Sequence, residues 1–332
     1  MNGMSDELAA RIRATRVTYR EVGLREGLQS HESVLPTDAK VGLFHGLKEA
    51  GARELNVVAF VNPSKMPQMA DAEAFLRALG PLREDTILTG LVPNDRGLAR
   101  ALAMREEGLL DGILLIFAES MSVLAANGME GSFEPLIERI ARSAATARDT
   151  GLDVSVFLST AYGCSIEGRI DPARVVEHAA LLRGLDGVTE LIISDSTGQA
   201  DPLQVLRLLD DLSDVLPIDE RIALHFHDTR GAALANIFAA LCSPFEHLVL
   251  DAAFGGWGGD FPFVPEALGN VATEDLLEML VGLGVETGAD AELVMAVTRD
   301  YAGLSGRRIG ARLHASSPIS WKREPQSSRE AI

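Results

Sequence analysis

Short runs of β-branched and aliphatic residues alternate with longer amphipathic stretches along most of the chain. A short apolar run between turn residues is typical of a buried strand, and apolar positions three and four residues apart are typical of a helix. The pattern predicts strands at residues 17–22, 55–60, 86–92, 112–117, 154–159, 191–194, 222–227 and 247–253. It predicts helices at residues 37–50, 70–79, 96–107, 133–150, 172–182, 202–212, 232–241, 274–281 and 289–304. The 172–182 helix is opened by Asp171, a favourable N-cap, and Pro172, a favourable first residue.

This alternation predicts the fold class. Strand and helix units that recur about every 30 residues match the arithmetic of a (β/α)8 TIM barrel of about 250 residues. A doubly wound open sheet is the main alternative, but no G-x-G-x-x-G motif follows the first strand. We therefore expect an α/β protein with a catalytic barrel over residues 17–288 and a helical extension over residues 289–315. Residues 1–16 and 316–332 are expected to be mobile terminal segments.

Composition and charge narrow the classes of function. The 48 acidic and 30 basic residues give a net charge of -18, which argues against nucleic acid or an anionic membrane as the main partner. The sequence shows neither a secretory signal nor an apolar run long enough to span a bilayer. Its two cysteines, Cys164 and Cys242, form no disulfide framework and no zinc motif. We expect a cytoplasmic protein that acts on a small molecule.

Two histidines stand at the end of the predicted seventh strand, in the tetrapeptide His225-Phe226-His227-Asp228. Side chains alternate in direction along a strand, so the two imidazoles share one face and can hold one metal ion. An isolated H-x-H is more often one core histidine and one surface histidine. The rest of the chain strengthens the metal interpretation, because it places further polar residues at the ends of other predicted strands.

These further residues lie where a TIM barrel builds its active site, at the C-terminal ends of the strands. Arg25 and Glu26 follow the first strand, Asp195 ends the sixth, and Asn270 lies beyond the eighth. A carboxylate, two imidazoles and an amide oxygen form a mixed set of oxygen and nitrogen ligands. Such a set suits Mg²⁺ or Mn²⁺ better than a structural zinc, because no thiolate is available to close the coordination shell.

Several sequence blocks, in one order, resemble those of a known family. They are residues 23–29 (GLREGLQ), 60–63 (FVNP), 67–69 (PQM), 163–168 (GCSIEG), 225–229 (HFHDT) and 269–276 (GNVATEDL). Over residues 19–288 the chain is similar to the 3-hydroxy-3-methylglutaryl-CoA lyases. These belong to a superfamily of metal-dependent, lyase-type TIM barrels that includes the isopropylmalate synthases.

The resemblance implies roles for the polar residues at the C-terminal ends of the predicted strands, which form the mouth of the barrel. The implied metal ligands are Glu26, His225, His227 and Asn270. Arg25 would stabilise the enolate oxygen that develops as a carbon–carbon bond breaks, and Asp195 would serve the proton chemistry near the substrate hydroxyl. Retro-aldol cleavage needs such a base, a Lewis acid and a fixed cation. The simpler alternative is that Arg25 and Glu26 form an ordinary solvated pair on a loop.

The chain also departs from the family pattern. Glu26 stands where the family usually has aspartate, and Asn56 where the lyases carry a glutamate on the second strand. In the glycine-rich stretch that matches residues 255–262, the lyases carry a cysteine that helps to protonate the enolate product. This chain has no cysteine there. Asp260 lies at or beside that position and could be a substitute acid or an ordinary turn residue. Glu32 occupies a place that the lyases fill with a basic residue.

Three residues are candidates for substrate binding: Gln29, Asn56 and Cys164. Cys164 matches a cysteine of the family's fifth-strand loop, where a structural or lining role is favoured over a reactive one.

These observations lead to a functional hypothesis. We expect a metal-dependent lyase that cleaves a 3-hydroxy acyl substrate, with an acyl-CoA as the implied small-molecule partner and Mg²⁺ or Mn²⁺ as cofactor. The closest named activity is the cleavage of 3-hydroxy-3-methylglutaryl-CoA to acetyl-CoA and acetoacetate. An aldolase or condensing enzyme for another hydroxy or oxo acid is one alternative, and an inactive barrel that acts as a binding protein is the second. Family resemblance also suggests a homodimer.

Overall fold

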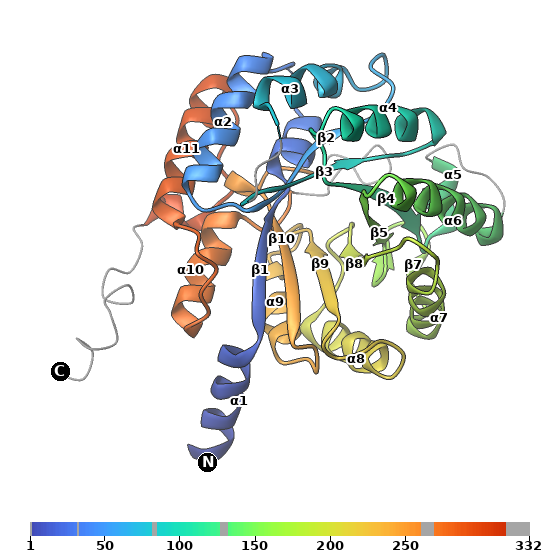
Figure 1. Ribbon diagram of the computed structural model, residues 1–332. Helices are drawn as coiled ribbons and strands as arrows, with labels where there is room; N and C mark the ends of the chain where they lie inside the picture. The colour runs from blue at the N-terminus through green and yellow to red at the C-terminus, as the bar shows by residue number, and fades with distance from the viewer. Residues whose placement is uncertain (1, 32, 82–84, 127–131, 260–268, 317–332) are drawn as a thin grey trace.

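Eight parallel strands close into a barrel in the computed structural model (Figure 1). The strands are β1 (Arg16–Glu21), β2 (Glu54–Ala59), β3 (Ile87–Leu91), β4 (Gly112–Ala118), β5 (Asp153–Ser159), β8 (Glu190–Asp195), β9 (Arg221–Phe226) and β10 (His247–Ala252). Their order around the barrel is β1-β10-β9-β8-β5-β4-β3-β2. The predicted (β/α)8 TIM barrel is confirmed, and each predicted strand overlaps one of these eight. The structure describes residues 2–31, 33–81, 85–126, 132–259 and 269–316.

Helices surround this barrel (Figure 1). They are α1 (Asn2–Ala14), α2 (Thr37–Glu49), α3 (Ala72–Leu79), α4 (Asp95–Glu106), α5 (Met121–Ala126), α6 (Phe133–Asp149), α7 (Pro172–Arg183), α8 (Pro202–Ser213), α9 (Ala233–Leu241), α10 (Thr273–Leu283) and α11 (Ala291–Ser305). Every predicted helix is present. The carboxylate of Asp171 accepts the backbone N–H of Ala173 and Pro172 is the first residue of α7, as predicted. In the described part of the chain, no helix is long and apolar enough to cross a membrane.

The strands are apolar runs because the barrel buries them on both faces. All six residues of β2 and all six of β8 are buried, and the outer sides of the strands pack against the helices. Parallel strands that are covered on both faces lose the alternation of polar and apolar residues that marks an exposed sheet. This explains why short continuous apolar runs were a reliable signal of the strands in this chain.

Several elements were not predicted by the hydrophobic pattern. Helix α1 precedes the barrel, α5 follows β4, and the two short strands β6 (Gly163–Cys164) and β7 (Gly168–Arg169) form an antiparallel pair outside it. After α11 the chain forms the 3₁₀ helix η4 (Arg312–Ala315), whose first two backbone N–H groups donate to the carboxylate of Asp275. The boundaries of the catalytic domain and of its extension remain predictions.

The N-terminal half of the barrel interior holds a network of four charged side chains, which we call the barrel floor. Its members are Arg20, Glu54, Glu190 and Arg221. Arg20 lies 2.5 Å from Glu190 and 3.5 Å from Glu54, and Arg221 contacts the same two carboxylates. Strands β1 and β8 are not neighbours, so the contact between Arg20 and Glu190 crosses the inside of the barrel.

Candidate active site

The two histidines of the H-x-H motif lie side by side at the C-terminal end of β9. His225 belongs to the strand and His227 follows it, and both side chains are buried. Their Nε2 atoms face each other at 3.2 Å. The alternation of side chains along the strand therefore places both imidazoles on one face, as the sequence predicted.

Arg25 and Glu26 are presented by a buried turn of π-helix, η1 (Gly23–Gly27), directly after β1. The backbone N–H of Glu26 donates to the carbonyl oxygen of Val22 at 2.8 Å, which anchors the turn to the strand. Single turns of π-helix are rare in proteins, and those that occur are frequently found at functional sites. A glycine is required at Gly23, because a Cβ there would lie 2.5 Å from the ring of Phe254.

Glu26 connects this turn to the histidines. Its Oε1 lies 3.1 Å from Nε2 of His227 and 3.6 Å from Nε2 of His225, and its Oε2 lies 2.9 Å from the guanidinium of Arg25. Burial alone would raise the pKa of Glu26, but the charges of His225 and Arg25 hold it well below its usual range. Burial would lower the pKa of His225, but Glu26 and Asp251 raise it to about 9.

The ligand atoms of Glu26, His225 and His227 all lie within 4.8 Å of one another, close enough to bind one metal ion. Together with Asn270, we call these residues the mouth cluster. Oε1 of Glu26 and Oδ1 of Asn270 are buried and accept no hydrogen bond. Unsatisfied buried oxygens are costly in a folded protein, and a cation between them and the imidazoles would satisfy them. The mouth cluster therefore fits a divalent metal.

Asn270 reaches the mouth cluster through a short backbone bridge to His227. Its Nδ2 donates to the carbonyl oxygen of Trp257, which leaves Oδ1 as the atom available for a metal. Gly258 packs against the same side chain with φ of +137°, and a Cβ there would lie 2.4 Å from Nδ2 of Asn270. The first half of the glycine-rich loop thus covers the cluster closely, and a larger residue would not fit.

Asp195 lies at the end of β8, as predicted, and is fully buried. Its two carboxylate oxygens accept the backbone N–H groups of Gln199 and Ala200, both at 2.8 Å. Burial raises the pKa of Asp195 above its usual value despite these two bonds. The carboxylate fixes the loop after β8, and its role in proton transfer remains a prediction.

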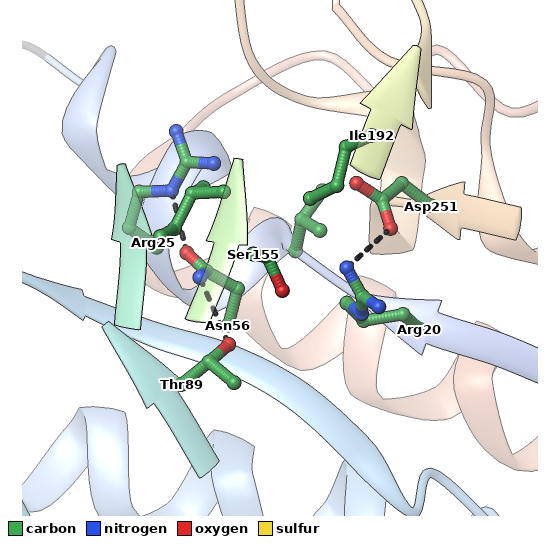
Figure 2. A pocket seen from close by; sticks show the side chains of 9 residues that line it. Arg20, Arg25, Asn56, Thr89, Ser155, Ile192 and Asp251 are labelled. Carbon is green, nitrogen blue, oxygen red and sulfur yellow. Dashed lines mark hydrogen bonds and ion pairs between the residues drawn. The ribbon is translucent and has the colours of Figure 1, made fainter. Parts of the chain in front are cut away.

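Asn56 and Arg25 line a small internal cavity beside the mouth cluster (Figure 2). Nε of Arg25 donates to Oδ1 of Asn56 at 2.7 Å, and Nδ2 of Asn56 donates to Thr89. The side chain of Asn56 thus holds the guanidinium in one orientation. Ser155 lines the same cavity from β5.

The other two candidates for substrate binding differ in accessibility. Gln29 is partly exposed, and its Oε1 is buried without a hydrogen bond. Cys164 is a free thiol, fully buried, and accepts a hydrogen bond from the hydroxyl of Ser120. Asp260, the candidate acid, lies outside the described residues.

Sequence reasoning missed Asp251, which follows Leu248-Val249-Leu250 on β10. Its Oδ2 lies 3.1 Å from Nδ1 of His225, on the side of the ring away from the other ligands. A charged residue inside an apolar strand was the available signal, because a buried carboxylate needs a partner.

The fold and the mouth cluster define the chain as a (β/α)8 barrel enzyme with a candidate metal site at the C-terminal ends of its strands. The family model described as HMGL-like matches residues 16–300, so the chain belongs to the HMGL-like family and is a lyase. The resemblance seen in the sequence blocks is thereby confirmed.

Named relatives cover most of the chain. It is 36% identical over 317 residues to the (R)-citramalyl-CoA lyase of Chloroflexus aurantiacus, covering 91% of this chain and 95% of the relative. It is 36% identical over 295 residues to the hydroxymethylglutaryl-CoA lyase of Pseudomonas mevalonii, covering 88% and 91%. A solved HMG-CoA lyase from Acinetobacter baumannii, in complex with coenzyme A and 3-methylmalate, superimposes with a TM-score of 0.82 at 29% identity, covering 92% and 97%.

Proposed function

We propose that this lyase cleaves a carbon–carbon bond in a 3-hydroxy acyl-CoA and depends on a divalent metal. The observation that carries the proposal is the mouth cluster, in which buried oxygens without hydrogen bonds face two imidazoles. Arg25 stands beside it as a fixed cation. This combination matches the needs of a reaction that develops negative charge on an enolate oxygen.

The metal is proposed to be Mg²⁺ or Mn²⁺, held by Glu26, His225, His227 and Asn270. These ligands offer oxygen and nitrogen atoms. Such a set suits Mg²⁺ or Mn²⁺ better than it suits a structural zinc, which binds thiolates in a closed site. When bound, the metal would act as a Lewis acid on the substrate oxygens.

Arg25 is proposed to hold the enolate oxygen. Its guanidinium is buried, bonded to Asn56 at one nitrogen and paired with Glu26 at another. An arginine fixed in this way is ready for the developing charge without rearranging, which is the main source of such stabilisation.

The proton steps are proposed to use Asp195 and Asp260. Asp195 would accept the proton of the substrate hydroxyl, and its pKa, raised by burial, brings it closer to the range useful for a base. Asp260 would protonate the enolate product. Its replacement by asparagine should lower turnover if this assignment holds, and full activity of Asp260→Asn would assign the step to water or to another group.

A CoA thioester is proposed as the substrate because the named relatives act on CoA thioesters and one solved relative contains coenzyme A. Three arginines of the segment after α11 support this choice: Arg307, Arg308 and Arg312. The guanidinium of Arg307 donates to the carbonyl oxygen of Gly27, at the end of the π-turn that carries Glu26. The segment thus places positive charge beside the mouth of an otherwise acidic protein, where CoA phosphates would need it. A homodimer remains a prediction.

The test is cleavage of 3-hydroxy-3-methylglutaryl-CoA and, in parallel, of (R)-citramalyl-CoA, which is shorter by one methylene. Protein loaded with Mg²⁺ or Mn²⁺ is compared with a chelated control, and acetyl-CoA release is measured. Turnover that the chelator abolishes supports the proposal, and the faster substrate identifies the acyl group. A folded, metal-loaded protein that cleaves neither would refute both substrates and direct the search to other hydroxy acids and to condensation.

A further inference from the structure

Behind the mouth cluster, three side chains on adjacent strands form a row that ends at a candidate metal ligand. Arg20 on β1 is paired in the sheet with Asp251 on β10, and Asp251 is paired with His225 on β9. We infer that Asp251, held by Arg20, is a positioning residue that orients His225 for metal binding. This inference deepens the proposed function and rests on its metal site.

The contact between Asp251 and His225 has the geometry that such a role needs. Nδ1 of His225 lies 3.1 Å from Oδ2 of Asp251, while Nε2 of the same ring points to His227 and Glu26. A histidine that binds a metal through one nitrogen commonly donates the N–H of the other to a carboxylate. That second contact fixes the tautomer and the angle of the ring.

Arg20 keeps Asp251 in this position. Nη1 of Arg20 lies 3.6 Å from Oδ1 of Asp251, an oxygen that accepts no hydrogen bond in the structure. Figure 2 shows the two side chains facing each other on one side of the internal cavity. Both are buried, so the guanidinium is the charge partner that allows a carboxylate to remain beside the histidine.

The barrel floor supplies a matched control for Arg20. Arg221 is also an arginine, and it pairs with the same Glu54 and Glu190. Of these two arginines, only Arg20 also forms an ion pair with Asp251 among the described residues. Removing either arginine therefore disturbs the same two carboxylates, but only the removal of Arg20 takes support from Asp251.

A second contact also holds the ring of His225, so Asp251 is not the only residue that orients it. The ring of Phe157 meets the ring of His225 edge to face, with centroids 5.0 Å apart. Phe157 confines the imidazole on one side, so we expect the loss of Asp251 to weaken metal binding without abolishing it.

The experiment measures the Kd for Mn²⁺ from the electron paramagnetic resonance signal of the free ion. Asp251→Asn, which keeps the size of the side chain, should bind Mn²⁺ about 10- to 100-fold more weakly than the wild type, the range seen for such outer contacts. Arg20→Met should also lose affinity, and Arg20→Lys should recover part of the loss. Arg221→Met should bind Mn²⁺ as the wild type does.

The outcomes separate this inference from the metal site on which it rests. If the wild type binds no Mn²⁺, the metal site and the inference both fail. If His225→Ala loses Mn²⁺ but Asp251→Asn retains full affinity, the metal site stands and the positioning role is wrong. If Arg221→Met loses as much affinity as Arg20→Met, the effect belongs to the floor as a whole, and the role of Arg20 is refuted.

Discussion

The barrel floor and the mouth cluster are both buried groups of polar side chains inside one barrel, but they differ in how their atoms are satisfied. In the floor, Glu54 and Glu190 each contact both arginines, and Arg20 also contacts Asp251. In the mouth cluster, Oε1 of Glu26 and Oδ1 of Asn270 accept no hydrogen bond. The charges of the floor thus pair with one another, whereas the mouth cluster keeps two buried oxygens that accept no hydrogen bond.

This difference separates a structural group from a functional one more clearly than residue type does. The desolvation of a buried ion pair can cost as much as the attraction gains, but removing one partner strongly destabilises the fold, because the other charge is left buried without compensation. A buried oxygen without a hydrogen bond calls for an explanation, such as a bound ion or water or a catalytic role. Substitutions in the two groups should therefore affect different properties. Predictions at His227 and Glu190 test this directly, and two more concern Arg25 and Glu21, which lie outside both groups.

The largest effect is expected at the mouth cluster, from His227→Ala. The variant should lose both Mn²⁺ binding and turnover, because one of two imidazole ligands is gone. His247→Ala is the control, since His247 lies at the opposite end of a barrel strand and contacts Thr18. It should bind Mn²⁺ as the wild type does. Unchanged metal affinity and activity in His227→Ala would contradict the ligand assignment.

The floor should respond in stability. Glu190→Gln leaves the buried Arg20 and the half-buried Arg221 short of one negative charge, and it should lower the free energy of unfolding by about 3–5 kcal/mol. The matched control is Glu107→Gln, which removes an exposed ion pair with Arg77 and should leave the free energy of unfolding nearly unchanged. Urea denaturation measures both. A loss in Glu190→Gln no larger than in the control would show that the floor contributes little.

Arg25→Met tests the part of the mouth that acts on the substrate. With saturating Mn²⁺, kcat should fall about 10²- to 10³-fold, the scale of one lost oxyanion donor. The Kd for Mn²⁺ should change far less than kcat, because Arg25 pairs with Oε2 of Glu26 and leaves Oε1, the oxygen that faces the two imidazoles, in place. Steady-state kinetics and the metal titration together give both values. A fully active variant would remove Arg25 from the enolate step.

The fold could be predicted from the sequence because its signal is local. Most strands contain a short apolar run, and helices follow at regular intervals, so the (β/α)8 barrel was recognisable without any contact information. Helix α1 was missed because it stands outside this alternation. The first strand begins at Arg16, one residue earlier than predicted, which is within the usual uncertainty of an element boundary.

The candidate site could be predicted in part. His225 and His227 were found by their spacing on one strand, and Glu26 by its place after another. The contacts of Arg20 were not foreseen, because they join β1 to β8 and β10, which are far apart from it in the sequence and meet it only when the barrel closes. The contact of Asp251 with His225 joins consecutive strands, but the apolar pattern does not show the register in which they pair. Nor could the sequence show that the oxygens of Asp195 bind the backbone of their own loop.

A third buried carboxylate sharpens the comparison, because neutral donors surround it. Glu21 accepts hydrogen bonds from the hydroxyls of Tyr19 and Thr273 and from two backbone N–H groups, those of Gly23 and Phe254. Burial outweighs these bonds and raises the pKa of Glu21 to about 7. In Glu190, the two arginines outweigh burial, and the pKa is lowered. Within one barrel, the pKa of a carboxylate paired with arginines is thus lowered, whereas the pKa of a carboxylate bonded to neutral donors is raised.

The smallest effect is expected from Glu21→Gln, as a change in pH dependence. Between the usual pKa of a glutamate, about 4.5, and about 7, the folded protein holds a proton at Glu21 that the unfolded chain has lost. Stability from this group is therefore present at low pH and is lost as the pH rises to about 7. Glutamine resembles the protonated form and does not titrate, so the variant should gain stability relative to the wild type over this range. Urea denaturation at several pH values between 5 and 8 measures the difference, and a constant difference would mean that Glu21 is ionised in the folded protein throughout.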